Sequence, residues 1–192
     1  MSDMVVAAPL RIEAALISSA ARSAAVRKTG MGPDRARAAA GELLRHGAAS
    51  LLVVGFCGGL DEDSVPGEVI IPEEVYDENH AEARVRCDLA PVLVSRLAGR
   101  GLKLRSGPIV CVSKIAVGER RAQLHAAGAI GVDMESVWLG AAAAGRPFGV
   151  VRVVLDSPSH ELFRVRAVGQ ALRAAGALRR VAGALHEWTP GV

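Results

Sequence analysis

The sequence predicts an α/β fold built around a mostly buried sheet. Short apolar runs of strand length alternate along the chain with Ala-, Leu- and Arg-rich stretches of helical length. The apolar runs, such as "SLLVVG" and "PFGVVRVVL", are almost uninterrupted, which is typical of strands covered on both faces. No repeat, linker or change of composition divides the chain, so we expect one domain over residues 1–192. A chain of 192 residues with 51% hydrophobic content can bury one substantial core.

The predicted strands are the short apolar runs. They are 4–9, 50–55, 67–75, 107–113, 129–133 and 147–155. The stretch 67–75 is either one strand or a strand pair bent at Pro72. Residues 76–88, "YDENHAEARVRCD", are strongly polar and predict an excursion at the surface.

The predicted helices are 11–21, 33–47, 90–101, 119–128, 134–145 and about 161–188. Pro33 and Gly47 mark the start and the end of the second helix. In the closing helix, an apolar stripe predicts a core-packed face with a solvated basic face beside it. The stripe comprises Leu162, Val165, Val168, Leu172, Ala175, Leu178, Ala182 and Leu185.

Composition and charge exclude several functional classes. The net charge of +3 comes from arginines spread along the chain, and 3% of residues are aromatic, so no nucleic-acid partner is expected. Cys57, Cys87 and Cys111 form no C-x-x-C pair, which favours reduced thiols over disulfides or a metal site. No long apolar run and no signal-peptide pattern occurs, so we expect a cytoplasmic protein, and no cofactor is implied.

Polar residues that could carry chemistry follow several predicted strands, where ligands gather in open α/β sheets. They lie in the turn into Glu13, in "VVGFCGGL" at 53–60, in "GVDMES" at 131–136 and in "RVVLDSP" at 152–158. The Gly-rich segment is either a plain turn that needs positive φ or a place where the backbone closely approaches a ligand. Asp133 and Glu135 either cap the following helix or form an acidic patch that accepts hydrogen bonds from ribose hydroxyls.

An arginine and an aspartate stand in the last predicted strand. Arg152 and Asp156 point to the same face, but their Cα atoms are roughly 13 Å apart in an extended strand, too far for an easy direct pair. A guanidinium in an apolar strand is costly unless paired, so Arg152 should meet a carboxylate from elsewhere or a bound anion. Asp156 is placed either as a catalytic acid or as the cap of the next turn.

These motifs, in this order, resemble the nucleoside phosphorylase superfamily, which includes purine and uridine phosphorylases and methylthioadenosine/S-adenosylhomocysteine nucleosidases. The resemblance runs over about residues 5–160 and implies a phosphorylase/hydrolase-like fold, a three-layer α/β/α arrangement with a central mixed, mostly parallel sheet. Its motifs are Glu13, "GMGPDRARAAA", "VVGFCGGL", "GEVIIPEEV", "VDMES" and "VVRVVLDSP". The segments "GFCGGL" and "LHAAGAIGVDMES" most resemble those of the nucleosidase-type branch found with hopanoid biosynthesis. The reaction that this resemblance implies removes adenine from adenosylhopane.

The resemblance implies roles for individual residues. Asp156 would donate a proton to purine N7, and Glu13 would orient or deprotonate the attacking water. Glu135, with Met134 beside it, would bind the ribose, and Arg152 would pair with Glu135 or Glu13. The other residues that would contact the substrate are Phe56, Cys57 and Gly58, with backbone groups from Ser113 to Ala116 at the base.

The sequence departs from the superfamily pattern in the Gly-rich segment. Phe56 stands where many nucleosidases have a serine, and no clear equivalent of the phosphate-binding arginines and serine of the phosphorylases occurs near it. Hydrolysis is therefore favoured, and phosphorolysis, with phosphate as co-substrate, is the alternative. Leu155 precedes the acid in place of a polar residue, which argues against an extra side-chain contact to the base from that position.

The resemblance also bears on partners. It implies a homodimer that takes a small nucleoside substrate. A non-catalytic nucleoside-binding protein is a further alternative, although a binder needs no acid and base on opposite sides of a bond. Because a lipid-linked substrate would make peripheral membrane contact useful, the closing helix is also a candidate membrane-facing surface.

Overall fold

The described chain forms a mixed sheet flanked by helices. The computed structural model describes residues 4–22, 24–45, 48–160 and 167–186. The strands are β1 (Met4–Ala8), β2 (Ala25–Lys28), β3 (Ser50–Gly59), β4 (Val69–Ile70), β5 (Glu74–Asp77), β6 (His80–Arg86), β7 (Leu104–Arg105), β8 (Ile109–Cys111), β9 (Gly131–Asp133) and β10 (Phe148–Asp156). The helices are α1 (Arg11–Ala20), α2 (Pro33–Arg45), α3 (Ala90–Leu97), α4 (Glu119–Ala126), α5 (Ser136–Gly140), the 3-10 helix η1 (Ala141–Ala143) and α6 (Ala167–His186).

β3 and β10 form the centre of the sheet and pair in parallel along most of their length. The strand order is β6-β5-β8-β9-β3-β10-β4-β7, and β1 pairs with the first part of β3 and with β2. The antiparallel pairs are β3 with β9, β4 with β10 and β5 with β6, whereas the other pairs are parallel. The expected mixed, mostly parallel sheet is confirmed.

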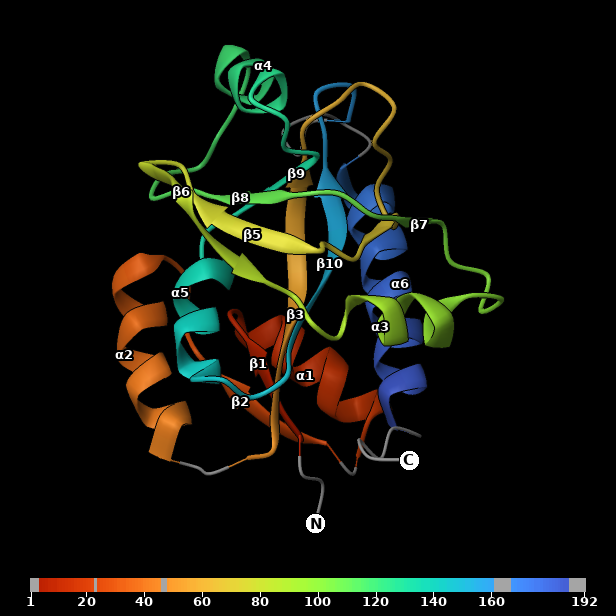
Figure 1. Cartoon of the computed structure of the whole chain (residues 1–192). Coiled ribbons are helices and arrows are strands. Elements are labelled where there is room, and N and C mark those ends of the chain that lie inside the picture. The colour runs from red at the N-terminus through yellow and green to blue at the C-terminus, as the bar shows by residue number, and fades with distance from the viewer. Residues whose placement is uncertain (1–3, 23, 46–47, 161–166, 187–192) are drawn as a thin grey trace.

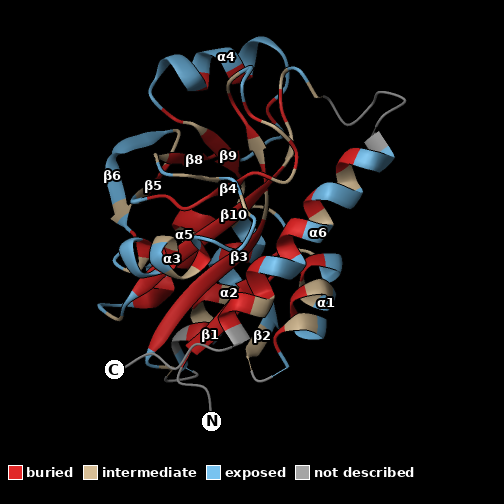
Figure 2. Ribbon diagram, turned by 90° about the vertical axis from the view of Figure 1, so that its right-hand side faces the viewer, coloured by how far each residue is buried: buried red, intermediate tan, exposed pale blue. Residues whose placement is uncertain are grey.

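Helices cover both faces of this sheet. α2 and α5 pack together on one side of β3 and β10, and α6 lies on the other side with α1 against it (Figure 1). Figure 2 shows that buried residues follow the strands and the inward sides of α1 and α6, while their outward sides are exposed. The three-layer arrangement is therefore confirmed. α4 lies beyond the end of the sheet at which β3 and β10 finish (Figure 1).

Several segments differ from the prediction because they form strands without a clear apolar pattern. Residues 53–60 are not a turn: β3 continues to Gly59, and Gly55, Gly58 and Gly59 have ordinary strand geometry rather than positive φ. The stretch 67–75 is a strand pair, and the polar segment after it carries β6, which pairs with β5 while its side chains stay mostly exposed. β2 and β7 are short strands that the apolar pattern did not indicate.

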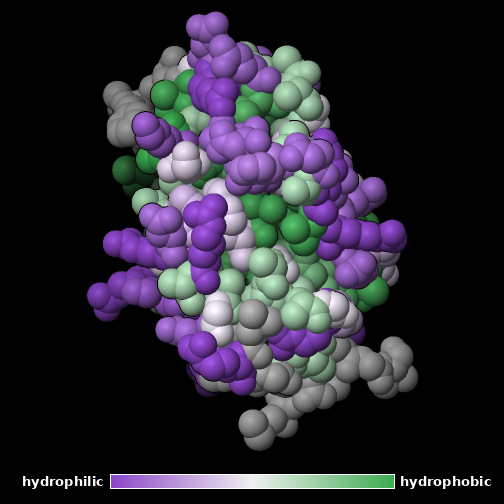
Figure 3. All heavy atoms as spheres, turned by 60° about the vertical axis from the view of Figure 1, so that its left-hand side comes forward, coloured by the Kyte–Doolittle hydropathy of each residue, from purple (hydrophilic) through white to green (hydrophobic). Residues whose placement is uncertain are grey.

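The structure corrects the apolar stripe predicted for the closing helix. Leu178, Ala182 and Leu185 are buried, but Val168 and Leu172 are 73% and 68% exposed. Residues 161–166 and 187–188 of that prediction lie outside the described residues. On the face drawn in Figure 3, hydrophilic side chains surround smaller hydrophobic patches. Among the helices that the structure describes, none combines the length and apolar character needed to cross a membrane.

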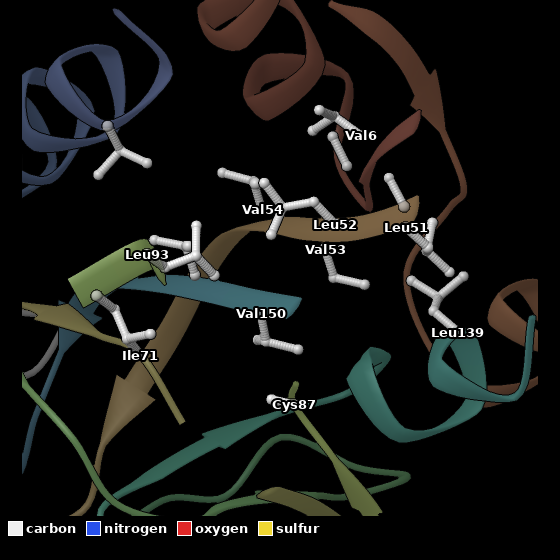
Figure 4. Close-up of a cluster of buried hydrophobic side chains, with 14 of the residues drawn as sticks. Val6, Leu51, Leu52, Val53, Val54, Ile71, Cys87, Leu93, Leu139 and Val150 are labelled. Carbon is white, nitrogen blue, oxygen red and sulfur yellow. The ribbon is translucent and has the colours of Figure 1, made fainter. Parts of the chain in front are cut away.

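The core consists mainly of aliphatic side chains from the central strands. Figure 4 shows residues 51–54 of β3 and Val150 of β10 packed between Leu93 of α3 and Leu139 of α5. Burying each such side chain contributes about 1.5–3 kcal/mol. This packed centre fixes the positions of the strand ends beyond it, where the polar residues gather.

Candidate active site

A pocket lies where β3, β9 and β10 end. It is lined by Pro9, Leu10, Glu13, Met31, Phe56, Cys57, Gly58, Val112, Ile115, Ala116, Arg121, Val132, Asp133, Met134, Glu135, Leu155 and Asp156. Most of the residues predicted to form the site are thus brought together. Two predicted residues are not in the lining: Arg152 is fully buried behind it, and Ser113 instead donates its backbone N–H to Glu78 Oε1 at 3.4 Å. Val112, Ile115 and Ala116 stand in the lining from the segment around Ser113.

Glu13 is fixed in the pocket wall by the first turn of α1. Its Oε2 accepts a hydrogen bond from the N–H of Leu10 at 2.6 Å, which satisfies the start of the helix. Its Oε1 accepts one from the N–H of Phe56 on β3, also at 2.6 Å. Burial raises the pKa of Glu13, although Arg152 and these two N–H groups oppose the rise. A buried carboxylate with a raised pKa is suited to accept a proton.

The buried guanidinium of Arg152 is shared by two carboxylates. Its Nη2 lies 2.6 Å from Asp133 Oδ2 and 3.3 Å from Glu135 Oε2. It also donates to the hydroxyl of Ser136 and, through Nη1, to the carbonyl of Phe56 at 3.3 Å. The pairing with Glu135 was one of the predicted alternatives, whereas the shorter contact to Asp133 was not predicted. Arg152 is therefore buried behind the pocket and does not line it.

Asp133 and Glu135 both line the pocket but make different contacts. Asp133 Oδ1 accepts hydrogen bonds from the N–H groups of Glu135 and Ser136 at 3.2 and 3.3 Å, and so caps the start of α5. Glu135 lines the pocket, with Oε1 accepting from the N–H of Gly32 at 3.0 Å. Burial raises the pKa of Glu135 to about 7, against the opposing charge of Arg152 and with help from the charge of Asp133.

The glycines of β3 allow side chains to approach the strand closely. A Cβ on Gly55 would lie 2.6 Å from Glu13 Oε1 and 2.8 Å from Arg152 Nη1. A Cβ on Gly58 would lie 3.2 Å from Arg121 Nη2 and 3.3 Å from Asp156 Oδ1. The groups that closely approach the Gly-rich segment are the site's own charged side chains, whereas the sequence predicted an approach to a ligand.

Asp156, at the end of β10, has a partner that the sequence did not indicate. Arg121 Nη2 lies 2.7 Å from Asp156 Oδ2, and Arg121 Nε donates to the carbonyl of Ala116 at 2.9 Å. The one sequence signal for the burial of Arg121 is its spacing. It precedes the buried Leu124 by three residues in an otherwise polar helix, which places both side chains on the same face.

The two candidate catalytic carboxylates reach β3 at neighbouring positions. Glu13 binds the N–H of Phe56, and Asp156 lies beside Gly58, two residues further along. Both carboxylates line the same pocket, which can therefore hold a small molecule within reach of each.

The phosphorylase superfamily matches this sequence over residues 11–182. The chain belongs to the phosphorylase superfamily. Its fold is similar to that of the 5′-methylthioadenosine/S-adenosylhomocysteine nucleosidase of Campylobacter jejuni, with a TM-score of 0.81, 13% identity, and coverage of 98% of this chain and 100% of that one. Comparison with curated proteins gives no significant match.

Two further solved structures share the superfamily fold. The futalosine hydrolase of Helicobacter pylori matches with a TM-score of 0.78, 13% identity, and coverage of 95% of this chain and 94% of that one. The nucleosidase of Neisseria meningitidis, solved with methylthio-immucillin-A, matches with a TM-score of 0.76, 18% identity, and coverage of 96% and 99%. At these identities the likeness establishes the fold alone.

Metal-binding groups and the pocket cysteine are the remaining features of this superfamily member that bear on its chemistry. Within the part of the chain that the structure describes, no group of His, Cys, Asp or Glu is arranged to hold a metal ion. Cys57 lines the pocket, but burial raises the pKa of its thiol far above neutrality, so it faces the pocket as an uncharged group.

Proposed function

We propose that the protein cleaves the N-glycosidic bond of a purine nucleoside by hydrolysis. The observation that carries this proposal is that Glu13 and Asp156 line one pocket, Glu13 bonded to the N–H of Phe56 and Asp156 beside Gly58 on the same strand. In glycosidases that use an acid and a base, one carboxyl group protonates the leaving group and the other activates a water. Membership of the superfamily and the likeness to nucleosidase folds support N-glycosidic chemistry.

The proposed reaction uses the carboxylates in separate roles. Glu135 accepts hydrogen bonds from the ribose hydroxyls, and Met134 packs against the sugar. Glu13 takes a proton from the water that attacks C1′, while the bond from C1′ to the base breaks. Asp156 donates a proton to N7, so that the base leaves uncharged.

The distribution of charge favours water over phosphate as the nucleophile. Arg121 is the one cationic side chain among the described lining residues, and it is engaged by Asp156. Arg152 is fully buried and already paired with two carboxylates. A phosphate dianion beside Glu13 and Glu135 would therefore meet carboxylates with no free cation to offset their charge.

The pocket mouth supports an adenine nucleoside with an apolar 5′ substituent, as in adenosylhopane. Met31 and Ile115 belong to the lining, and they are 45% and 72% exposed. Ile12 and Val117, next in sequence to lining residues, are 60% and 55% exposed. Covering large exposed apolar side chains with an apolar group of the substrate would contribute to binding.

The test is a panel of adenosines that carry a 5′ hydroxyl, a 5′ methylthio group or 5′ alkyl chains of increasing length. Each is incubated with and without phosphate, and free base, ribose and ribose 1-phosphate are measured. We expect free sugar without phosphate and a kcat/KM that rises with alkyl length. Release that requires phosphate would show a phosphorylase, and binding without release would show a non-catalytic nucleoside-binding protein.

A further inference from the structure

Arg121 carries a charge that the proposed reaction does not explain. Its side chain is 5% exposed, its Nη2 pairs with Asp156 Oδ2 at 2.7 Å, and its Nε donates to the carbonyl of Ala116 at 2.9 Å. The third nitrogen, Nη1, is buried without a hydrogen-bond partner. An unsatisfied buried donor is unfavourable for folding, so stability alone is a poor reason for an arginine at this place.

The charge of Arg121 bears directly on the chemistry of Asp156. A guanidinium in contact with a carboxyl group favours the ionised form of that group. An acid that protonates N7 must instead hold its proton until the base leaves. Arg121 favours the ionised form of Asp156, whereas the proposed reaction needs the protonated form. The position of Arg121 therefore affects the pH range in which Asp156 holds its proton.

Among the described residues near Asp156, three further groups bear on its charge less directly than Arg121 does. On β3, Cys57 faces it as a thiol whose pKa burial raises, so it adds no charge near neutral pH. On β9, Val132 is apolar and lies against Gly58. In the turn after β10, His160 bonds to the hydroxyl of Ser157.

We propose that Arg121 is a positioning residue for Asp156, which holds the carboxyl group in place from α4 and sets the upper pH limit at which it can act as an acid. This inference rests on the proposed function, because it assumes that Asp156 serves as the acid. The first turn of α4 is thereby coupled to the base end of the pocket. The carbonyl of Ala116, which accepts a hydrogen bond from Arg121, belongs to a residue that also lines the pocket. A base that contacts this segment therefore also contacts a group that holds Arg121 in place.

The test follows the Asp156 carboxyl group directly, by carbon-13 NMR of aspartate-labelled protein with Asp156→Asn to assign its signal. Arg121→Met removes the charge and keeps an apolar stem, and the titration midpoint of Asp156 should rise by about 1–3 pH units. Arg121→Lys keeps the charge and should leave the midpoint nearer the wild-type value. Arg120→Met is the matched control, because this neighbouring side chain is half exposed and pairs with Glu78. An unchanged midpoint in Arg121→Met would overturn the inference.

Activity gives a second measurement that separates this inference from the proposed function. The alkaline limb of kcat/KM should move to higher pH in Arg121→Met and stay in place in Arg120→Met. If wild-type protein releases no base from any nucleoside, the proposed function fails, and the NMR titration still decides the electrostatic role of Arg121. If Arg121→Met does not fold, Arg121→Lys must show a lower kcat with an unmoved alkaline limb; a lysine variant with wild-type kcat would contradict the positioning role.

Discussion

At the scale of single residues, the site is organised by one arginine among three acids. Arg152 contacts Asp133 and Glu135, and its charge also acts on Glu13. Burial is the main physical reason that the pKa values of Glu13 and Glu135 are raised; the charge of Arg152 opposes the rise, and the charge of Asp133 adds to it.

Replacing Arg152 with alanine should lower both stability and activity. Its removal leaves buried carboxylates without a counter-charge, at a cost of about 3–5 kcal/mol. Asp156→Asn removes the charged partner of Arg121, but Asp156 is 15% exposed and an asparagine oxygen can still accept a hydrogen bond, so we expect a smaller loss of melting temperature than for Arg152→Ala. Thermal melts of the two variants beside wild type test this prediction, and an Arg152→Ala protein that melts like wild type would refute the buried ion pair.

Glu135 should make the protein less stable as pH rises through neutrality. Its pKa is about 7 in the folded state and near the ordinary value of 4.5 when unfolded, so between these values the folded state binds more protons. Its contribution is therefore fully present below about pH 4.5 and is lost as pH rises through about 7. We expect Glu135→Gln to flatten the fall in melting temperature between pH 5 and pH 8, measured in matched buffers. An identical fall in both proteins would rule out Glu135 as its source.

At the scale of elements, β3 is the strand on which the site is assembled. It receives Glu13 from α1 through the N–H of Phe56, and Arg152 from β10 through the carbonyl of the same residue. Gly55 leaves the space in which the carboxylate and the guanidinium meet. The glycines of this strand are thus explained by close approach of side chains.

Gly55→Ala should destabilise the protein and reduce base release together. The added methyl group would lie 2.6 Å from Glu13 Oε1 and 2.8 Å from Arg152 Nη1, so one of the two buried charges must move. Gly41→Ala in α2 is the control, because its methyl group meets nothing within 4 Å and alanine in a helix interior is favoured by about 0.5–1 kcal/mol. Chemical denaturation of both variants, with an activity assay, tests this; equal stability of the two would show that Gly55 is not tightly packed.

The elements also show what the sequence could and could not predict. The buried strands and most helices were predictable, because their apolar periodicity reflects burial directly. β6 was not, because an edge strand with exposed side chains satisfies its backbone bonds without an apolar pattern. Glu13, Glu135 and Asp156 were identified through motifs, whereas Arg121 and the contact between Asp133 and Arg152 depend on how distant segments meet.

At the scale of the whole molecule, the sheet brings together residues far apart in the chain. α1 supplies Glu13, the β9–α5 junction supplies Glu135 and β10 supplies Asp156, and all three line the same pocket. We propose a homodimer, as the nucleosidase resemblance suggests, and sedimentation analysis of the purified chain is its test.

The most direct test of the account compares two leaving groups in single-turnover assays of base or phenol release. Adenosine-type substrates need protonation at N7, whereas 4-nitrophenyl riboside releases a phenolate that needs no proton. Asp156→Asn should lose about 10²–10⁴-fold on the nucleoside and little on the aryl riboside, because only the first needs the acid. Glu13→Gln should lose activity on both, because both need the activated water. Equal losses of Asp156→Asn on the two substrates, or full activity of Glu13→Gln, would contradict the assignment of acid and base.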